Sequence, residues 1–198
     1  MTLPSLLRAV GLHVPRGVSV DGRVLVGRAA TAAVSAGTAT ALLRHTFHGG
    51  DDPLPARSAA PWWEDPDACA ADVAEVAQAF PGFQLDQSDG GHAWGGTIDT
   101  GRGRFAVDVV SNPDGGLPRI VPVVPRILGR NEGRRGFRRP EHLYRSGSLC
   151  VADAAEWDPA THTSVTAIAW AAHWYAAYTD WRLGGPWPTD GYRPSAAA

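Results

Sequence analysis

Three strand-like runs in close succession constrain the fold more than any other feature of the sequence. They span residues 93–99, 104–110 and 119–124, and the second run alternates apolar side chains with more polar ones. This alternation is typical of a strand with one buried face. The separating residues 101–103 and 112–116 are rich in Gly, Asn and Asp, which favour tight turns. Adjacent strands joined by short turns predict an antiparallel meander.

Helix signals stand on both sides of these strands. Before them, Asp65-Pro66-Asp67 offers an N-cap, a first-turn proline and an early acid, and the predicted helix ends at Pro81-Gly82. After them, a long helix is predicted from Thr163 to Leu183. Its broad aromatic face is predicted to belong to the core: Trp170, Trp174 and Trp181. A helix, a meander, an irregular segment and a second helix form an α+β plan.

Residues 1–60 differ from the rest of the chain because they are rich in Ala and Gly. Within them we predict a hairpin at 18–26 that turns on Asp21-Gly22, a helix from Ala29 to about His45, and then a linker over 49–61. No chemical role follows from these residues.

Composition excludes several classes of protein. The 198 residues suffice for one domain with an extension, and a hydrophobic content of 44% supports a buried core. A formal net charge of −2 gives no electrostatic reason to expect nucleic acid as the main partner. No run approaches the roughly 18 apolar residues of a membrane span, and no secretory signal is present, so we expect a cytoplasmic protein.

An Arg- and Gly-rich stretch at 129–140 is interpreted as a solvated loop or as a docking surface for an acidic partner.

Cys150 lies in the segment that is richest in reactive side chains. A thiolate is a strong nucleophile, and its thioester stays reactive toward amines. The turn at Ser146-Gly147 is expected to expose Cys150 on a loop. A buried, inert thiol and a cysteine hydrolase that uses His142 are the alternatives, although a hydrolase also needs a third, orienting group. No Cys-x-x-Cys or His-x-x-x-His pair supports a metal site, and we expect no cofactor.

The order of residues around Cys150 resembles the active site of ubiquitin-conjugating enzymes. His142, Gly147-Ser148-Leu149-Cys150 and Trp157-Asp158-Pro159 follow one another as in that family. The end of the chain is similar to a bacterial branch found in antiphage operons, including CBASS operons and ubiquitin-like conjugation operons. The residues that carry this second similarity are Trp174, Tyr178, Trp181 and Gly185-Pro186-Trp187-Pro188. The resemblance covers roughly residues 62–188.

The resemblance implies a ubiquitin-conjugating (UBC) fold for residues 61–198, with 1–60 as an N-terminal extension. This fold consists of an N-terminal helix, an antiparallel meander, an active-site loop and a long crossover helix. The implied function is to accept a ubiquitin-like protein from an activating enzyme as a thioester on Cys150. The modifier then passes to an amine of an acceptor protein, in bacterial antiviral defence.

The sequence departs from the family at His142-Leu143-Tyr144, where most eukaryotic members have His-Pro-Asn. A shortened His-x-Tyr version resembles the eukaryotic branch that modifies protein N-termini. We expect Tyr144 or Ser148 to support the tetrahedral oxyanion, although Tyr144 could equally only pack. Asp153 and Asp158 are expected either to position the incoming amine or to cap the next helix or turn, and His142 to hold the loop. A catalytically silent scaffold of the same fold, which binds the ubiquitin-like protein or activating enzyme, is the second hypothesis.

Overall fold

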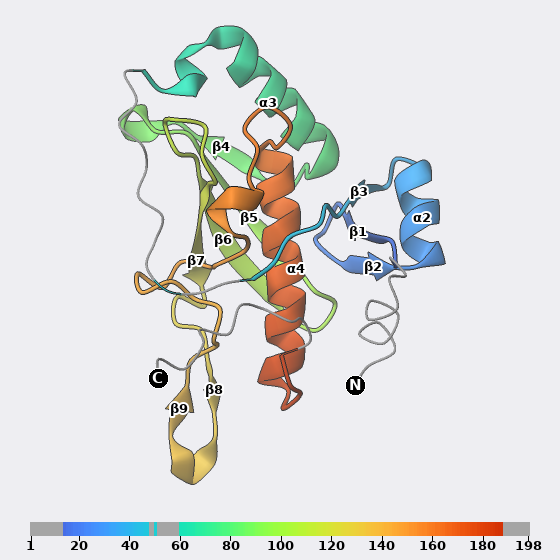
Figure 1. Cartoon of the computed structure of the whole chain (residues 1–198), viewed down its shortest axis with the longest axis vertical. Helices are drawn as coiled ribbons and strands as arrows, with labels where there is room; N and C mark the ends of the chain where they lie inside the picture. The colour runs from blue at the N-terminus through green and yellow to red at the C-terminus, as the bar shows by residue number, and fades with distance from the viewer. Residues whose placement is uncertain (1–13, 48–49, 51–59, 188–198) are drawn as a thin grey trace.

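The core of the molecule is an antiparallel sheet covered by a long helix. The computed structural model describes residues 14–47, 50 and 60–187 (Figure 1). Four strands form a meander in sequence order: β4 (Gln84–Asp86), β5 (Ala93–Asp99), β6 (Arg104–Val110) and β7 (Arg119–Val124). Helix α4 (Ser164–Arg182) crosses one face of this sheet, and α3 (Pro66–Ala79) contacts α4 near its N-terminus. The predicted combination of helices with an antiparallel sheet is confirmed.

The three long strands have the predicted bounds. In β6, the alternating side chains Phe105, Val107 and Val109 are all buried. The turn between β5 and β6 is closed by the Thr100 N–H, which donates to the Gly103 carbonyl at 2.9 Å. Strand β4 was not predicted, because its three residues are mostly polar and its order comes only from pairing with the edge of β5.

Both predicted helices begin at their capping residues. The Asp65 side chain accepts hydrogen bonds from the N–H groups of Asp67 and Ala68, which fixes the first turn of α3. Thr163 caps α4 through a capping box, and Gly184 follows the helix with φ of 100°. The aromatic face of α4 is buried as predicted: Trp170, Trp174 and Trp181.

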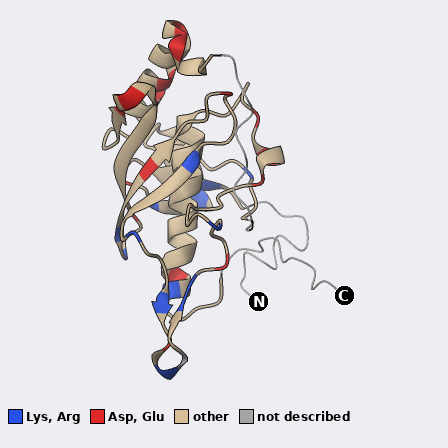
Figure 2. Cartoon of the chain, turned by 90° about the vertical axis from the view of Figure 1, so that its left-hand side faces the viewer, with Lys and Arg blue, Asp and Glu red and all other residues tan. Residues whose placement is uncertain are grey.

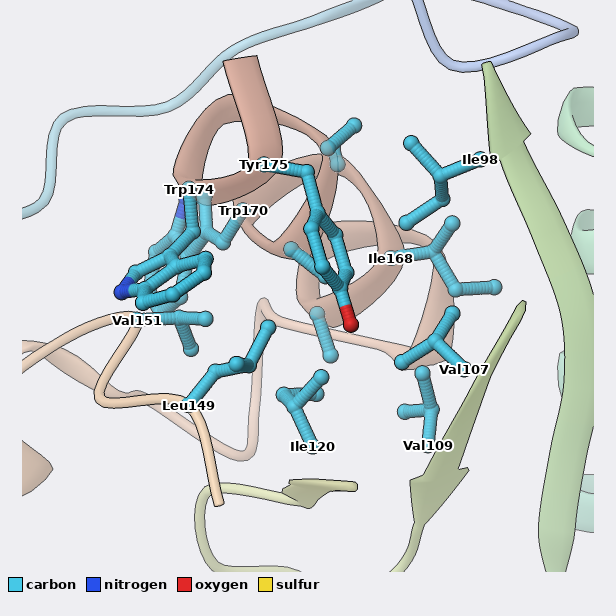
Figure 3. Close-up of a cluster of buried hydrophobic side chains, with 14 of the residues drawn as sticks. Ile98, Val107, Val109, Ile120, Leu149, Val151, Ile168, Trp170, Trp174 and Tyr175 are labelled. Atoms are coloured by element: carbon cyan, nitrogen blue, oxygen red, sulfur yellow. The ribbon is translucent and has the colours of Figure 1, made fainter. Parts of the chain in front are cut away.

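Figure 3 shows the core between α4 and the sheet, where Ile168 and Tyr175 of the helix lie opposite Val107 of β6. Leu149 and Val151, from the segment before α4, complete this cluster. Apolar contact between helix and sheet therefore also holds the segment that contains Cys150.

Asp72 of α3 ties the N-terminus of α4 to the sheet. Its carboxylate accepts hydrogen bonds from His92 Nε2 at 3.1 Å, Trp94 Nε1 at 2.9 Å and Ser164 Oγ at 2.9 Å. Burial alone would raise the pKa of Asp72, but these hydrogen bonds outweigh it and leave the pKa below its usual value. The buried carboxylate is thus ionised and its hydrogen bonds hold three elements together.

Residues 14–47 form a small unit beside α4. It contains β1 (Arg16–Ser19), β2 (Val24–Val26), α2 (Arg28–Ser35) and β3 (Ala39–Ala41), with strand order β2-β1-β3. The predicted hairpin is confirmed, and Gly22 in its turn has φ of 97°. The predicted helix to His45 is wrong beyond residue 35. Gly37, with φ of 69°, ends the helical region, and Ala39–Ala41 pairs with β1 instead.

The N-terminal unit packs on the rest of the chain. Val18 of β1 is fully buried in the main core, and the Asp99 N–H donates to the Asp21 carbonyl at 2.8 Å. A chain of hydrogen bonds also links Arg16 to His173 of α4, and His173 to His45. Most of the predicted linker at 49–61 lies outside the described residues.

The arginine-rich stretch forms a hairpin rather than an open loop. Strands β8 (Arg130–Asn131) and β9 (Phe137–Arg138) pair antiparallel, and a 3-10 turn, Gly133–Arg135, closes them. Figure 1 shows this hairpin extending beyond the C-terminal end of α4. We refer to residues 129–139 as the basic hairpin.

Candidate functional site

The segment that ends at Cys150 folds back on itself as a tight hairpin. The Tyr144 N–H donates to the Ser148 carbonyl at 2.9 Å, and the Cys150 N–H donates to the His142 carbonyl at 3.3 Å. Gly147 adopts φ of 95°, a conformation that favours glycine and allows the turn. The family-like residues His142, Tyr144, Ser148 and Cys150 are therefore held together by local backbone geometry.

This hairpin attaches to the edge of the meander. The Leu149 N–H donates to the Ile120 carbonyl of β7 at 2.9 Å. Leu149 and Val151 point into the core (Figure 3), so alternation along an extended chain directs Cys150 to the other side. The side chain of Cys150 is nevertheless 0% exposed. The expectation that the turn exposes Cys150 is wrong in this conformation, because the segment packs as a hairpin instead of standing away as a loop.

The side chains of Cys150 and Tyr144 share one hydrogen-bond acceptor. Cys150 Sγ lies 3.9 Å from the Ala152 carbonyl oxygen, and the Tyr144 hydroxyl donates to the same oxygen at 3.4 Å. Tyr144 is 9% exposed. The Tyr144 hydroxyl and the Cys150 thiol are therefore held near each other by a shared acceptor, the Ala152 carbonyl.

His142 holds the hairpin through its backbone. Its carbonyl accepts from Trp174 Nε1 of α4 at 2.9 Å as well as from the Cys150 N–H. The imidazole ring contacts Phe47 and Trp187, with ring centroids 6.0 and 5.0 Å away. The buried His142 thus connects the Cys150 hairpin to α4, to Phe47 of the N-terminal unit and to Trp187 after α4.

Ser148 and Asp153 make local contacts on either side of Cys150. Ser148 is buried, and its hydroxyl oxygen accepts from the Ser146 hydroxyl at 3.1 Å. Asp153 caps a short 3-10 helix, Ala154–Glu156, by accepting from the Ala155 N–H at 2.9 Å. Capping was one of the two roles expected for Asp153.

Asp158 caps the next turn. Its carboxylate accepts from the Ala160 N–H and from the Thr161 hydroxyl, both at 3.0 Å. These hydrogen bonds hold the pKa of Asp158 below its usual value, so the group is a poor proton acceptor at neutral pH. Capping is again the observed role, and a catalytic role for either aspartate stays a prediction.

Sequence reasoning missed the N-terminal contacts of the site. Glu156 accepts from the Thr46 N–H at 2.8 Å and from the Thr46 hydroxyl at 2.7 Å. The Arg145 N–H donates to the Gly50 carbonyl at 3.0 Å, and Gly50 forms a bridge with Tyr144. No local pattern signals these contacts, because the partners are about a hundred residues apart in the sequence.

The described part of the chain offers neither a metal cluster nor a membrane-spanning helix. Within it, no group of three or more His, Cys, Asp and Glu residues is placed to hold a metal ion. Over the same residues, no helix has the length and apolar character needed to cross a membrane.

Comparison with known protein families shows which family the chain belongs to. The family described as Type II CBASS E2 protein matches residues 72–194, which is more than half of the sequence. The chain belongs to this family. Curated proteins and solved structures gave no match. The matched range of this CBASS E2 protein contains the meander, the Cys150 hairpin and α4, and it begins within α3. The resemblance seen in the sequence is thereby confirmed as a CBASS E2-like relationship.

Proposed function

We propose that this CBASS E2 protein carries a ubiquitin-like protein as a thioester on Cys150 and passes it to an amine of an acceptor protein. The observation that carries the proposal is the position of Cys150. It lies in the hairpin between β7 and α4, where its thiol and the Tyr144 hydroxyl share the Ala152 carbonyl as acceptor, in a chain of the CBASS E2 family. The order of α3, meander, hairpin and α4 also supports a UBC fold, which the resemblance implies.

The chemistry needs two acyl transfers. In the first, the Cys150 thiolate attacks the thioester that joins the modifier to its activating enzyme, and the enzyme's thiolate leaves. In the second, an acceptor amine attacks the Cys150 thioester, the attacking nitrogen loses a proton to solvent, and the Cys150 thiolate leaves as the amide forms. Each step passes through a tetrahedral oxyanion, which Tyr144 would stabilise by turning its hydroxyl from Ala152 toward the oxygen.

Because Cys150 is buried, loading of the modifier requires a conformational change. A fully buried thiol does not reach the thioester of another protein, so loading requires the covering residues to move away from Cys150. The same burial favours the second candidate function, a silent scaffold of this family that binds the modifier or the activating enzyme without reacting.

A loading assay tests the proposal. The protein is incubated with the activating enzyme, the ubiquitin-like protein and ATP, with both proteins taken from the same operon. We expect an adduct that DTT removes, that is absent in Cys150→Ala and that persists in the matched control Cys69→Ala. A robust adduct in Cys150→Ala would show that the carrier assignment is wrong.

Two further measurements separate the alternatives. A scaffold predicts that Cys150→Ala keeps full protection against phage, whereas a carrier predicts loss of protection. A cysteine hydrolase predicts ATP-independent release of the modifier from an isopeptide substrate. The hydrolase is the least supported, because His142 meets Cys150 through its backbone carbonyl while its ring contacts Phe47 and Trp187.

A further inference from the structure

The basic hairpin is anchored firmly at its base. The Tyr178 hydroxyl lies 3.0 Å from both the N–H and the carbonyl oxygen of Gly129. The Arg130 guanidinium donates to the Trp181 carbonyl at 2.7 Å and stacks 4.5 Å above the Trp181 ring. These contacts with the last turns of α4 give a projecting segment a fixed direction, which a solvated loop would not need.

The tip of the hairpin is also ordered by its own contacts. The Glu132 N–H donates to the Gly136 carbonyl at 2.8 Å, and the Gly133 N–H donates to the Asn131 side chain at 2.8 Å. Gly133 and Gly136 both have positive φ, so the sequence supplies glycine where the turn requires it.

Ion pairs within the hairpin neutralise part of its charge. Glu132 pairs with Arg130 at 2.8 Å and lies 3.7 Å from Arg138, which also pairs with Glu141 at 2.7 Å. Arg134 and Arg139 are exposed and form no ion pair with the described residues. Figure 2 shows basic residues along this projection. Two arginines are therefore left to meet charge on another molecule.

Apolar side chains accompany these arginines. Phe137 is 57% exposed although its ring lies against Gly129, where an added Cβ would come within 2.1 Å of it. Ile127, just before the hairpin, is 74% exposed. Aromatic residues and arginine are the residues most enriched at the energetic centres of protein interfaces.

The exposed surface of the basic hairpin continues to the candidate site around Cys150. The Arg139 guanidinium lies 3.8 Å from the position that a Cβ on Gly147 would occupy, and Gly147 forms the turn before Cys150. A protein bound to the hairpin would therefore lie beside the residue that is proposed to react.

We propose that the basic hairpin docks the acyl donor, the activating enzyme, through acidic side chains that surround an apolar recess on that enzyme. This inference rests on the proposed function, which requires such a donor. Charged contacts around a small apolar contact give fast association and fast release. The activating enzyme needs both rates, because it must leave after each transfer. A nucleic acid fits less well, because the ion pairs of Glu132 and Glu141 with Arg130 and Arg138 reduce the positive charge that phosphates would bind.

The test measures loading and binding with the activating enzyme charged with the ubiquitin-like protein. Arg134→Glu and Arg139→Glu are compared with Arg28→Glu, an exposed residue in the first turn of α2 with the same charge change. Each hairpin variant is expected to raise the KM of loading about tenfold at 50 mM NaCl and less at 300 mM, with kcat unchanged. Phe137→Ser should raise KM at both salt concentrations, and Arg28→Glu should leave KM as in the wild type.

Interferometry on the same proteins separates failure of docking from failure of the carrier function. If the wild type binds the activating enzyme and the hairpin variants bind it at least tenfold more weakly, docking stands even where no thioester forms. Equal Kd values for all variants, or no binding by the wild type, overturn the docking proposal. Weakened binding of a 20-nucleotide single-stranded RNA by the hairpin variants, with an unchanged Kd for the enzyme, would also overturn it.

Discussion

Acidification should weaken the attachment of the N-terminal unit to α4, because this attachment uses neutral imidazoles. Arginine only donates, so the Arg16 guanidinium donates to His173 Nε2 at 2.9 Å. His173 Nδ1 must then donate to His45 Nε2, also at 2.9 Å, and His45 Nδ1 donates to the Leu43 carbonyl at 2.9 Å. A proton added to His45 Nε2 would meet the His173 N–H and break this chain.

The size of the effect follows from the pKa of His45. Burial is the largest effect and lowers this pKa from 6.5 to about 4. The hydrogen bond to the Leu43 carbonyl and the charge of Glu156 raise the pKa by smaller amounts, and the charge of Arg16 lowers it further. The contribution of His45 to stability is therefore complete above pH 6.5 and is lost as the pH falls from 6.5 to 4. The loss is about 2 kcal/mol at pH 5 and about 3 kcal/mol at pH 4.

Urea denaturation of the wild type and His45→Gln at several pH values between 7.5 and 4 measures this loss. Glutamine stays neutral, so the free energy of unfolding of the variant should fall less than that of the wild type by the amounts above. Effects of carboxylates such as Asp72 occur in both proteins and cancel in the difference. Parallel stability curves for the two proteins would refute the role assigned to His45.

Three further predictions concern buried groups. Asp72→Asn should lower the free energy of unfolding by about 3 kcal/mol in urea denaturation, because an amide cannot accept from all the donors around it; a change below about 0.5 kcal/mol would contradict this. Tyr175→Phe should raise the thermal midpoint, since the buried hydroxyl has no hydrogen-bond partner among the described residues and its removal gains about 1 kcal/mol; an unchanged midpoint would argue against this. Iodoacetamide should modify Cys69 faster than Cys150 in the native protein, and both equally in urea, as followed by mass spectrometry. Equal native rates would show that Cys150 is uncovered in solution.

The sequence allowed prediction of those helices and strands whose bounds depend on neighbouring residues. Phe105, Val107 and Val109 alternate in β6, and Asp65 and Thr163 cap the two long helices, so their bounds follow from neighbouring residues. These signals fixed the meander and the helices around it.

Elements that depend on distant partners could not be predicted in the same way. Alanine-rich residues 39–41 favour a helix by themselves but form β3 because β1 offers a free edge. The residues around Cys150 were identified from their order, whereas the burial of the thiol depends on tertiary packing. The bond from Thr46 to Glu156 likewise joins segments that have no common sequence pattern.

The position of Val18 and Phe47 in the main core has a practical consequence for work on this family. A recombinant fragment cut to the matched range, 72–194, would start after the Asp65 cap and would leave open the space that these two side chains fill. Such a fragment should behave as a molten or aggregating species, and its inactivity would say nothing about Cys150. Sequence matching delimits the family, but the hydrophobic core includes side chains from outside the matched range.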